Sequence, residues 1–275
     1  FKLKESMKIL GKFIFTSLMI LGVTGTIILS YVIFYVIGFY GDSIHYDMRA
    51  AKLHLTSMIY INDENNDPKE YDRVYKGENR IWVEFNDIPQ YMKDAIIAIE
   101  DKRFMEHHGV DWVRTSGAFF SLMSSKNSYG GSTLTQQLIK NLTENNEVSI
   151  IRKAKEIFRA LNFEKEYSKD EILGAYLNVV SFGSGQRGVE SAANLYFGKK
   201  IKDCSLIECA AIAGITQNPV AYTPLLNPQK NKERRELVLY EMFSQGKISD
   251  QEYKSALDES SKMQFKSLDE NNEVV

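Results

Sequence analysis

Hydrophobic and polar positions divide the chain into a long apolar run, a mixed segment and a helical remainder. No charged residue lies between Lys12 and Asp42, and the 29 residues at positions 13–41 are rich in Ile, Leu, Phe, Val and Tyr. A helix rises about 1.5 Å per residue and a bilayer core is about 30 Å thick, so this run predicts one tilted transmembrane helix.

The residues that flank this run have the pattern of a signal anchor. Four lysines and one Glu precede it, and Tyr and Phe residues gather at its far end. The positive-inside rule then predicts a cytoplasmic basic tail at residues 1–12, a single-pass anchor in the cell membrane and an extracellular remainder. A cleaved signal peptide is the alternative, but the apolar run is long and no small-x-small cleavage site follows it.

Residues 42–81 are mixed and polar, and we expect them to form a stem above the membrane. The polar run at residues 62–68 predicts a turn between the apolar pieces at residues 55–61 and 81–85. Such a pattern is typical of short strands or a hairpin, so the stem should contain β structure.

Beyond Pro89 the spacing of apolar residues becomes helical and no repeat of 20 to 50 residues is present. The sequence therefore predicts one mostly α-helical domain at residues 82–265, followed by a polar tail or truncated linker at residues 266–275. The helix signals are capping boxes at Ser168 with Glu171 and Ser249 with Glu252, a start at Asn227 and Pro228, and a stop at Gly246.

Composition narrows the classes of function. The net charge of −2 combines +3 on the first 40 residues with −5 on the other 235, so nothing attracts nucleic acid in bulk. Cys204 and Cys209, in an apolar stretch, are predicted to be buried thiols, and the four His have no zinc-ligand spacing. We predict no metal site and no required cofactor. The sequence leaves open whether the protein needs a divalent cation, Mg²⁺ or Mn²⁺.

Three polar clusters are candidates for chemistry. Glu100 and Asp101 follow an apolar run, where a carboxylate partly removed from water suits a general base. Gly130 and Gly131 precede a predicted helix that Ser132 or Thr133 can cap. One face of that helix carries Thr133, Gln137 and Lys140, which suit phosphate or sugar, and the other carries Leu134, Leu138 and Leu142.

The third cluster places Arg152 and Glu156 one turn apart on a helix whose buried seam includes Ala154 and Ile157. Each cluster taken alone also has a plain structural alternative: a charged helix end, a capped helix start or a surface ion pair.

Together the clusters resemble the peptidoglycan glycosyltransferase family, the lipid II polymerases found alone or as the first domain of class A penicillin-binding proteins. Glu-Asp-x-x-Phe-x-x-His-x-Gly begins at Glu100, Gly-Gly-Ser-Thr-x-Thr-Gln-Gln at Gly130, and Arg-Lys-x-x-Glu at Arg152. Residues 169–178 and 187–198 resemble the fourth and fifth motifs. Gly174 departs from the family, which usually has an acidic residue there.

The resemblance implies a lysozyme-like helical fold and an undecaprenyl-linked disaccharide substrate, with lipid II, the nascent glycan strand, the lipid bilayer and other cell-wall synthesis and division proteins as partners. It makes Glu100 the general base for the acceptor 4-hydroxyl, with Asp101 in support and inversion at the donor's anomeric carbon. Lys140 and Arg152, with Lys155, would hold the pyrophosphate, and Glu156 would orient them or the donor. The other implied substrate ligands are Ser132, Thr133, Gln137, Asn141, Phe104 and His107.

The chemistry of the leaving group favours a transferase. A glycosidase protonates a poor leaving group and needs two carboxylates at the bond, whereas a pyrophosphate leaves as an anion and needs cations such as Lys140, Arg152 and Lys155. A lytic muramidase and a non-catalytic membrane-anchored cell-wall scaffold remain the alternatives. The only Ser-x-x-Lys, at residues 244–247, has no Lys-Thr-Gly after it, so we predict no transpeptidase site. The start at Phe1 suggests a trimmed chain, and the polar tail suggests a linker cut short. Because the interior resembles bifunctional relatives, a fragment of a bifunctional protein is favoured over a complete monofunctional enzyme.

An apolar segment near the first cluster is predicted to dip into the lipid interface, with core packing as the alternative. Its apolar residues are Val110, Trp112, Val113, Phe119, Phe120, Leu122 and Met123.

Overall fold

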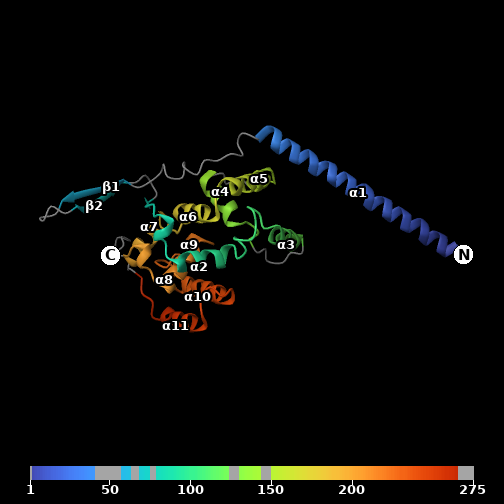
Figure 1. Ribbon diagram of the computed structural model, residues 1–275. Coiled ribbons are helices and arrows are strands. Elements are labelled where there is room, and N and C mark those ends of the chain that lie inside the picture. Colours follow the sequence, from blue (N-terminus) through green and yellow to red (C-terminus); the bar gives the residue numbers. More distant parts are fainter. Residues whose placement is uncertain are drawn as a thin grey trace.

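The computed structural model describes residues 2–40, 57–62, 68–74, 79–123, 130–143 and 150–265, and it is mostly helical, as predicted. Figure 1 shows a packed group of helices, from which a long helix, α1 (Lys2–Tyr40), and a hairpin of β1 (Ser57–Asn62) and β2 (Pro68–Val74) project; α1 approaches the group at α5.

Helix α1 contains a stretch long and apolar enough to cross a bilayer. Met7–Tyr35 has a mean hydropathy of 2.1 and none of it is buried against protein. Leu21 and Phe34, for example, are 72% and 76% exposed. Because so much apolar surface is unfavourable in water, the helix fits a membrane anchor. The basic tail is not a separate element, since α1 already begins at Lys2.

The predicted hairpin forms, but with a different second strand. β1 and β2 are antiparallel, from Ser57 opposite Val74 to Asn62 opposite Pro68. The predicted strand at residues 81–85 is wrong, because these residues run as extended chain into the short 3₁₀ helix η3 (Phe85–Asp87). Their apolar side chains, including Trp82 and Val83, pack against the core, so a strand-like pattern serves tertiary packing here.

A small parallel bridge fastens the stem to the helices. β3 (Asn79–Arg80) pairs with β4 (Gln186–Arg187), and the Asn79 side chain donates to Gln186 Oε1 at 3.0 Å. Asn178 then clamps the next residues, accepting from the Val83 N–H at 2.8 Å and donating to the Val83 carbonyl at 2.9 Å. Among the described residues, Asn79 and Arg80, which the sequence placed in the stem, therefore pair with the helical domain.

Helix α8 (Leu206–Ile215) lies at the centre of the domain. All its residues from Cys209 to Ile215 are buried, and a helix that is apolar all round belongs in a core. It packs against α2 (Gln90–Glu100), α7 (Val189–Phe197), α9 (Pro219–Tyr222), α10 (Pro228–Ser244) and α11 (Asp250–Ser260). Cys204 and Cys209 are buried free thiols, as predicted, and burial raises the pKa of Cys204 to about 12.

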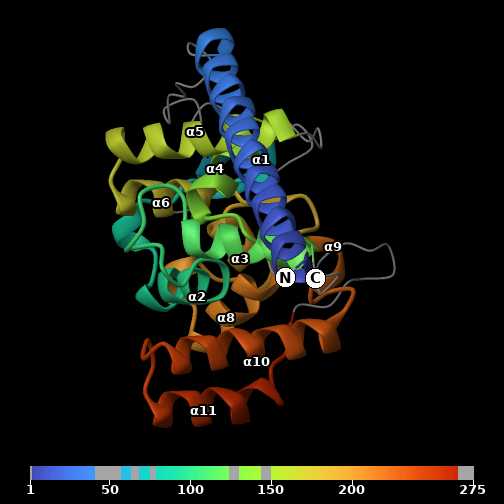
Figure 2. The same cartoon turned by 90° about the vertical axis from the view of Figure 1, so that its right-hand side faces the viewer.

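A second group of helices stacks on this core. In Figure 2, α4 (Leu134–Thr143) lies between α5 (Ile150–Glu166) and α6 (Lys169–Val179), on the side opposite α10 and α11. The predicted leucine face of α4 is confirmed, because Leu134 and Leu138 are fully buried. The remaining elements are α3 (Trp112–Met123) and the 3₁₀ helix η4 (Ile201–Asp203).

The predicted helix signals are also confirmed. Ser168 and Ser249 each form a full capping box, α10 begins at Pro228, and Gly246 follows its end at φ +68°. Gly174, the departure from the family pattern, lies against Phe85, whose ring a Cβ would meet at 3.2 Å. A larger residue there would push against η3.

Two glycines of the motifs let the loops around the site approach neighbouring helices. Gly109 has φ +84°, and a Cβ there would lie 2.4 Å from the carbonyl oxygen of Ala160 on α5. Gly188 has φ +82°, and its Cβ would lie 2.7 Å from the carbonyl oxygen of Asn178. Both positions combine a backbone conformation that L residues avoid with a contact that leaves no room for a side chain.

We expect Gly109→Ala to destabilise the domain by about 3 kcal/mol, through backbone strain and displacement of α5. Urea unfolding of the detergent-solubilised chain, followed by tryptophan fluorescence, measures this loss. Gly117→Ala is the matched control, because a Cβ at helical Gly117 meets nothing within 4 Å and the change should be neutral or slightly stabilising. Equal stabilities of the two variants would contradict the expectation.

Candidate active site

A cavity of about 400 Å³ brings together residues from all three predicted clusters. Its walls come from the end of α2, helix α4 with the residues just before it, helix α5, the residues just after α6 and the junction between α8 and α9. Seven of the expected site residues line it: Glu100, Ser132, Gln137, Lys140, Asn141, Arg152 and Glu156.

Glu100 is the last residue of α2 and is half-buried in this cavity. Its Oε2 accepts a hydrogen bond from Gln137 Nε2 at 2.9 Å, and its Oε1 accepts one from the Thr216 hydroxyl at 2.6 Å. The Tyr176 hydroxyl donates to Gln137 Oε1 at 3.1 Å, so the Gln137 amide must turn its NH₂ group toward Glu100. Burial, with the charges of Glu100 and Asp101, raises the pKa of Tyr176 far above 10, so it stays a donor.

Asp101 is buried beneath Glu100 and joins the first cluster to the second. Its Oδ2 accepts from the backbone N–H of Leu134, the first residue of α4, at 2.9 Å, and lies 2.9 Å from His107 Nε2. An anion at a helix N-terminus is favourable, because the N–H groups there lack partners within the helix. Arg114 closes the other side by donating to the backbone carbonyl of Glu100.

Three residues expected to bind substrate are instead interior. Phe104 is fully buried, and the His107 side chain is only 7% exposed. Thr133 is the predicted cap of α4, since its Oγ1 accepts from the Gln136 N–H and Gln136 Oε1 accepts from the Thr133 N–H, and it also donates to the Gly109 carbonyl at 2.7 Å. These side chains hold the loop between α2 and α3, residues 101–111 and here called the first loop, against α4 rather than line the cavity.

Two ion pairs that share Glu156 form the basic wall of the cavity. Glu156 accepts from Arg152 Nη1 at 2.8 Å, as the one-turn spacing predicted, and from Lys153 Nζ at 2.5 Å. Lys153 also donates to Ser132 Oγ at 2.8 Å, which links α5 to the start of α4. Because two cations share Glu156 and Lys140 is exposed beside them, this wall is positive and suits an anionic group.

Lys155 does not line this cavity. It borders an adjoining hollow of about 40 Å³, together with Lys140, Arg152 and Arg159. Burial lowers the pKa of Arg159. Lys153, rather than Lys155, is therefore the lysine of α5 on the main cavity. Within the ranges that the structure describes, no group of three or more His, Cys, Asp and Glu side chains is placed to hold a metal ion.

The sequence profile described as Transglycosylase matches residues 65–243, which is more than half of the chain. The chain belongs to the transglycosylase family. The resemblance inferred from the five motifs is thus confirmed, and family membership also supports the lysozyme-like description of this helical domain.

Proteins with sequences similar to this chain include three penicillin-binding proteins. The chain is 45% identical over 196 residues to penicillin-binding protein 1A of Clostridium botulinum, covering 68% of this chain and 24% of that protein. It is 43% identical to penicillin-binding protein 1F of Bacillus subtilis, covering 76% and 29%, and 39% identical to penicillin-binding protein 1A of Clostridium perfringens, covering 90% and 37%. The chain thus spans about a quarter to a little over a third of these relatives.

A solved structure, penicillin-binding protein 1A from Haemophilus influenzae, is 26% identical, with a TM-score of 0.44 over 75% of this chain and 21% of that one.

Sequence reasoning missed Lys153, Thr216 and Gln217 on this transglycosylase-family cavity. Lys153 stands three residues before Glu156, and that i, i+3 spacing was a usable signal. Thr216 and Gln217 lie 116 and 117 positions after Glu100, and they reach the cavity only because α8 packs against α2. No local pattern carries that information.

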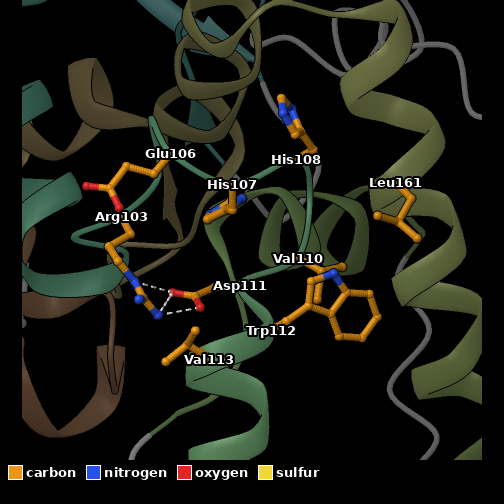
Figure 3. Close-up of a pocket in the computed structure, with 9 residues that line it drawn as sticks. All are labelled: Arg103, Glu106, His107, His108, Val110, Asp111, Trp112, Val113 and Leu161. Carbon is orange, nitrogen blue, oxygen red and sulfur yellow. Dashed lines mark hydrogen bonds and ion pairs between the residues drawn. The ribbon is translucent and has the colours of Figure 1, made fainter.

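A second cavity, of about 370 Å³, lies between the first loop and α5 (Figure 3). Asp111 caps α3 by accepting from the Arg114 N–H and forms a two-pronged pair with Arg103. Trp112 and Val113 beside it are 58% and 68% exposed, whereas Val110 is buried. The predicted interfacial segment is therefore mixed: Val110 belongs to the core, and the side chains at residues 119–123 lie outside the described ones.

Asp111 should make the stability of the loop depend on pH. Burial alone would raise its pKa, but the Arg114 N–H and the Arg103 guanidinium lower it below the ordinary 3.8. Its contribution is therefore complete above pH 3.8 and is lost as the pH falls through the lowered folded value. Asp111→Asn should be less stable than the wild type at pH 7, and in urea unfolding this difference should shrink as the pH falls below 3.8. A difference that is constant with pH would contradict this.

Proposed function

We propose that this domain polymerises lipid II into glycan strands at the outer face of the cytoplasmic membrane. The observation that carries the proposal is the single cavity in which the Glu100 carboxylate faces the same space as Lys140, Arg152 and Lys153. A base and an anion-binding wall in one cavity are what transfer from a pyrophosphate-linked sugar requires. Family membership supports the same reaction class.

In the proposed step, the 4-hydroxyl oxygen of the acceptor sugar bonds to the anomeric carbon of the donor. The bond from that carbon to the pyrophosphate oxygen breaks, and the pyrophosphate leaves with the electron pair. Glu100 takes the hydroxyl proton as general base, and attack from the opposite face inverts α to β. Asp101 acts indirectly, by fixing the end of α2 on which Glu100 sits.

The cations and polar groups of the cavity would receive the leaving pyrophosphate. Lys140 and Arg152, with Lys153, would hold it, and Lys155 would add positive charge from the adjoining hollow. Glu156 orients Arg152 and Lys153 by bonding both. The half-buried amide of Asn141 and the hydroxyl of Ser132 are the remaining candidates for sugar or phosphate contacts.

The anchor and the second cavity support a membrane-bound substrate. We propose that α1 crosses the membrane with its basic end inside, which places the domain outside, and that exposed Trp112 and Val113 touch the lipid interface. A domain that works on a lipid-linked substrate gains from such contact, because it keeps the cavity near the headgroups.

Glu100→Gln should reduce lipid II polymerisation by about 10²- to 10⁴-fold, since the amide cannot accept the proton. The measurement is glycan-strand formation from purified lipid II by the full chain, with melting temperature as the check on folding. Glu106→Gln is the control, because Glu106 is exposed and lies outside the main cavity. Muropeptide release from isolated cell wall would instead indicate a muramidase, and a wild-type chain that folds but neither builds nor cuts glycan would indicate a scaffold.

Trp112 should lie in the lipid interface when the full chain is reconstituted in vesicles. With Trp82→Phe, Trp112 is the single tryptophan, and its fluorescence should shift to the blue and be quenched by brominated lipids. With Trp112→Phe, half-buried Trp82 is the reporter and should remain unquenched. Equal quenching of the two reporters, or none of Trp112, would contradict the interfacial position.

A further inference from the structure

The hydroxyl of Thr216 lies between two acceptors. Its Oγ1 is 2.6 Å from Glu100 Oε1 and 2.8 Å from the carbonyl oxygen of Ala213, one turn back at the end of α8. A hydroxyl has one proton and two lone pairs, so it can donate to only one of these oxygens at a time. Which oxygen receives the proton then depends on the charge of Glu100.

Both protonation states of Glu100 can bond Thr216. When Glu100 is ionised, the hydroxyl donates to Oε1, because a bond to a charged acceptor is the stronger one. When a proton resides on Oε1, Glu100 becomes the donor, Thr216 Oγ1 accepts, and the hydroxyl proton turns to Ala213. No covalent bond changes in Thr216, and every donor keeps an acceptor.

Gln137, the other partner of the carboxylate, lacks this versatility. Tyr176 donates to Gln137 Oε1, so the Gln137 NH₂ group is held toward Glu100 Oε2 and can only donate. Gln137 thus favours the ionised form alone. Thr216 can also accept a hydrogen bond from Glu100 when Glu100 carries a proton.

We propose that Thr216 is a positioning residue for the general base, with a hydroxyl that turns between Glu100 and Ala213 as Glu100 gains and loses its proton in each catalytic cycle. This inference rests on the proposed role of Glu100. It extends the active site to the α8–α9 junction, a region outside the five sequence motifs.

Other charged groups around Glu100 do not depend on Thr216. Arg114 on α3 donates to the Glu100 carbonyl, and Asp101 lies beneath Glu100. Burial lowers the pKa of Arg234 on α10, and the charge of Glu100 partly opposes this shift. Across the cavity are Lys140, the Arg152 and Lys153 pairs with Glu156, and Tyr176 behind Gln137. Because Thr216 bonds none of these, changing it should affect the general base and leave the anion-binding wall in place.

The test is the pH profile of lipid II polymerisation by the full chain. Thr216→Val keeps the shape of Thr without the hydroxyl, so kcat/KM should fall about tenfold. The acidic limb should move up by about one pH unit, because the ionised base loses the stronger bond. Thr216→Ser restores the hydroxyl and should recover most of both changes. Thr223→Val is the control, since the Thr223 hydroxyl is also hydrogen-bonded, but to buried Tyr196 and away from the residues that line the cavity.

The outcomes separate this inference from the proposed function. If wild type is active and Glu100→Gln is inactive, an unmoved acidic limb in Thr216→Val overturns the role of Thr216. A Thr216→Ser variant as impaired as Thr216→Val, with the limb unmoved, shows a structural role only and also overturns it. If Thr216→Val fails to fold, the acidic limb of the pH profile of Thr216→Ala decides by the same criterion. An active Glu100→Gln variant instead refutes the proposed function itself.

Discussion

The contact between Asp101 and the first N–H of α4 is the joint on which the site depends. It is a buried anion at a helix N-terminus, and it holds the end of α2 against the start of α4 at 2.9 Å. Glu100 is the neighbour of Asp101, and Gln137 lies one turn into α4, so the same joint brings these two side chains within hydrogen-bond distance. Without it, the carboxylate and its amide partner would have no fixed relation.

Around this contact, the buried residues of the motifs hold the exposed residues of the motifs in place. Phe104 and His107 fill the loop beneath Glu100, Thr133 caps α4 and bonds the Gly109 carbonyl, and Gly109 lets the loop touch α5. A motif residue can therefore be indispensable without touching substrate. The cavity itself is lined by residues on another face of the same segments, such as Gln137 and Lys140 of α4, because each helix has one buried and one open face.

One residue, Asp111, fixes both the loop beside the cavity and the start of α3, where apolar residues are exposed. Asp111 both caps α3 and pairs with Arg103, and so fixes the loop that also carries His107. The exposed Trp112 and Val113 follow immediately, which places apolar surface one short loop away from Glu100. An apolar anchor at the other end of the chain and an apolar patch beside the site suit a substrate with a lipid tail.

The sequence by itself determined the apolar anchor, the helix starts at Ser168 and Pro228 and the leucine face of α4, because each depends on spacing within one element. The resemblance of its motifs to the family also identified seven of the residues that line the cavity. Sequence reasoning misplaced the second stem strand and assigned substrate contacts to buried Phe104 and Thr133, since local patterns do not reveal what packs above a face. Only the tertiary structure decided that Lys153 rather than Lys155 faces the cavity and that Thr216 meets Glu100. The physical reason is that a contact across 116 positions comes from the packing of α8 on α2, which no short stretch of sequence encodes.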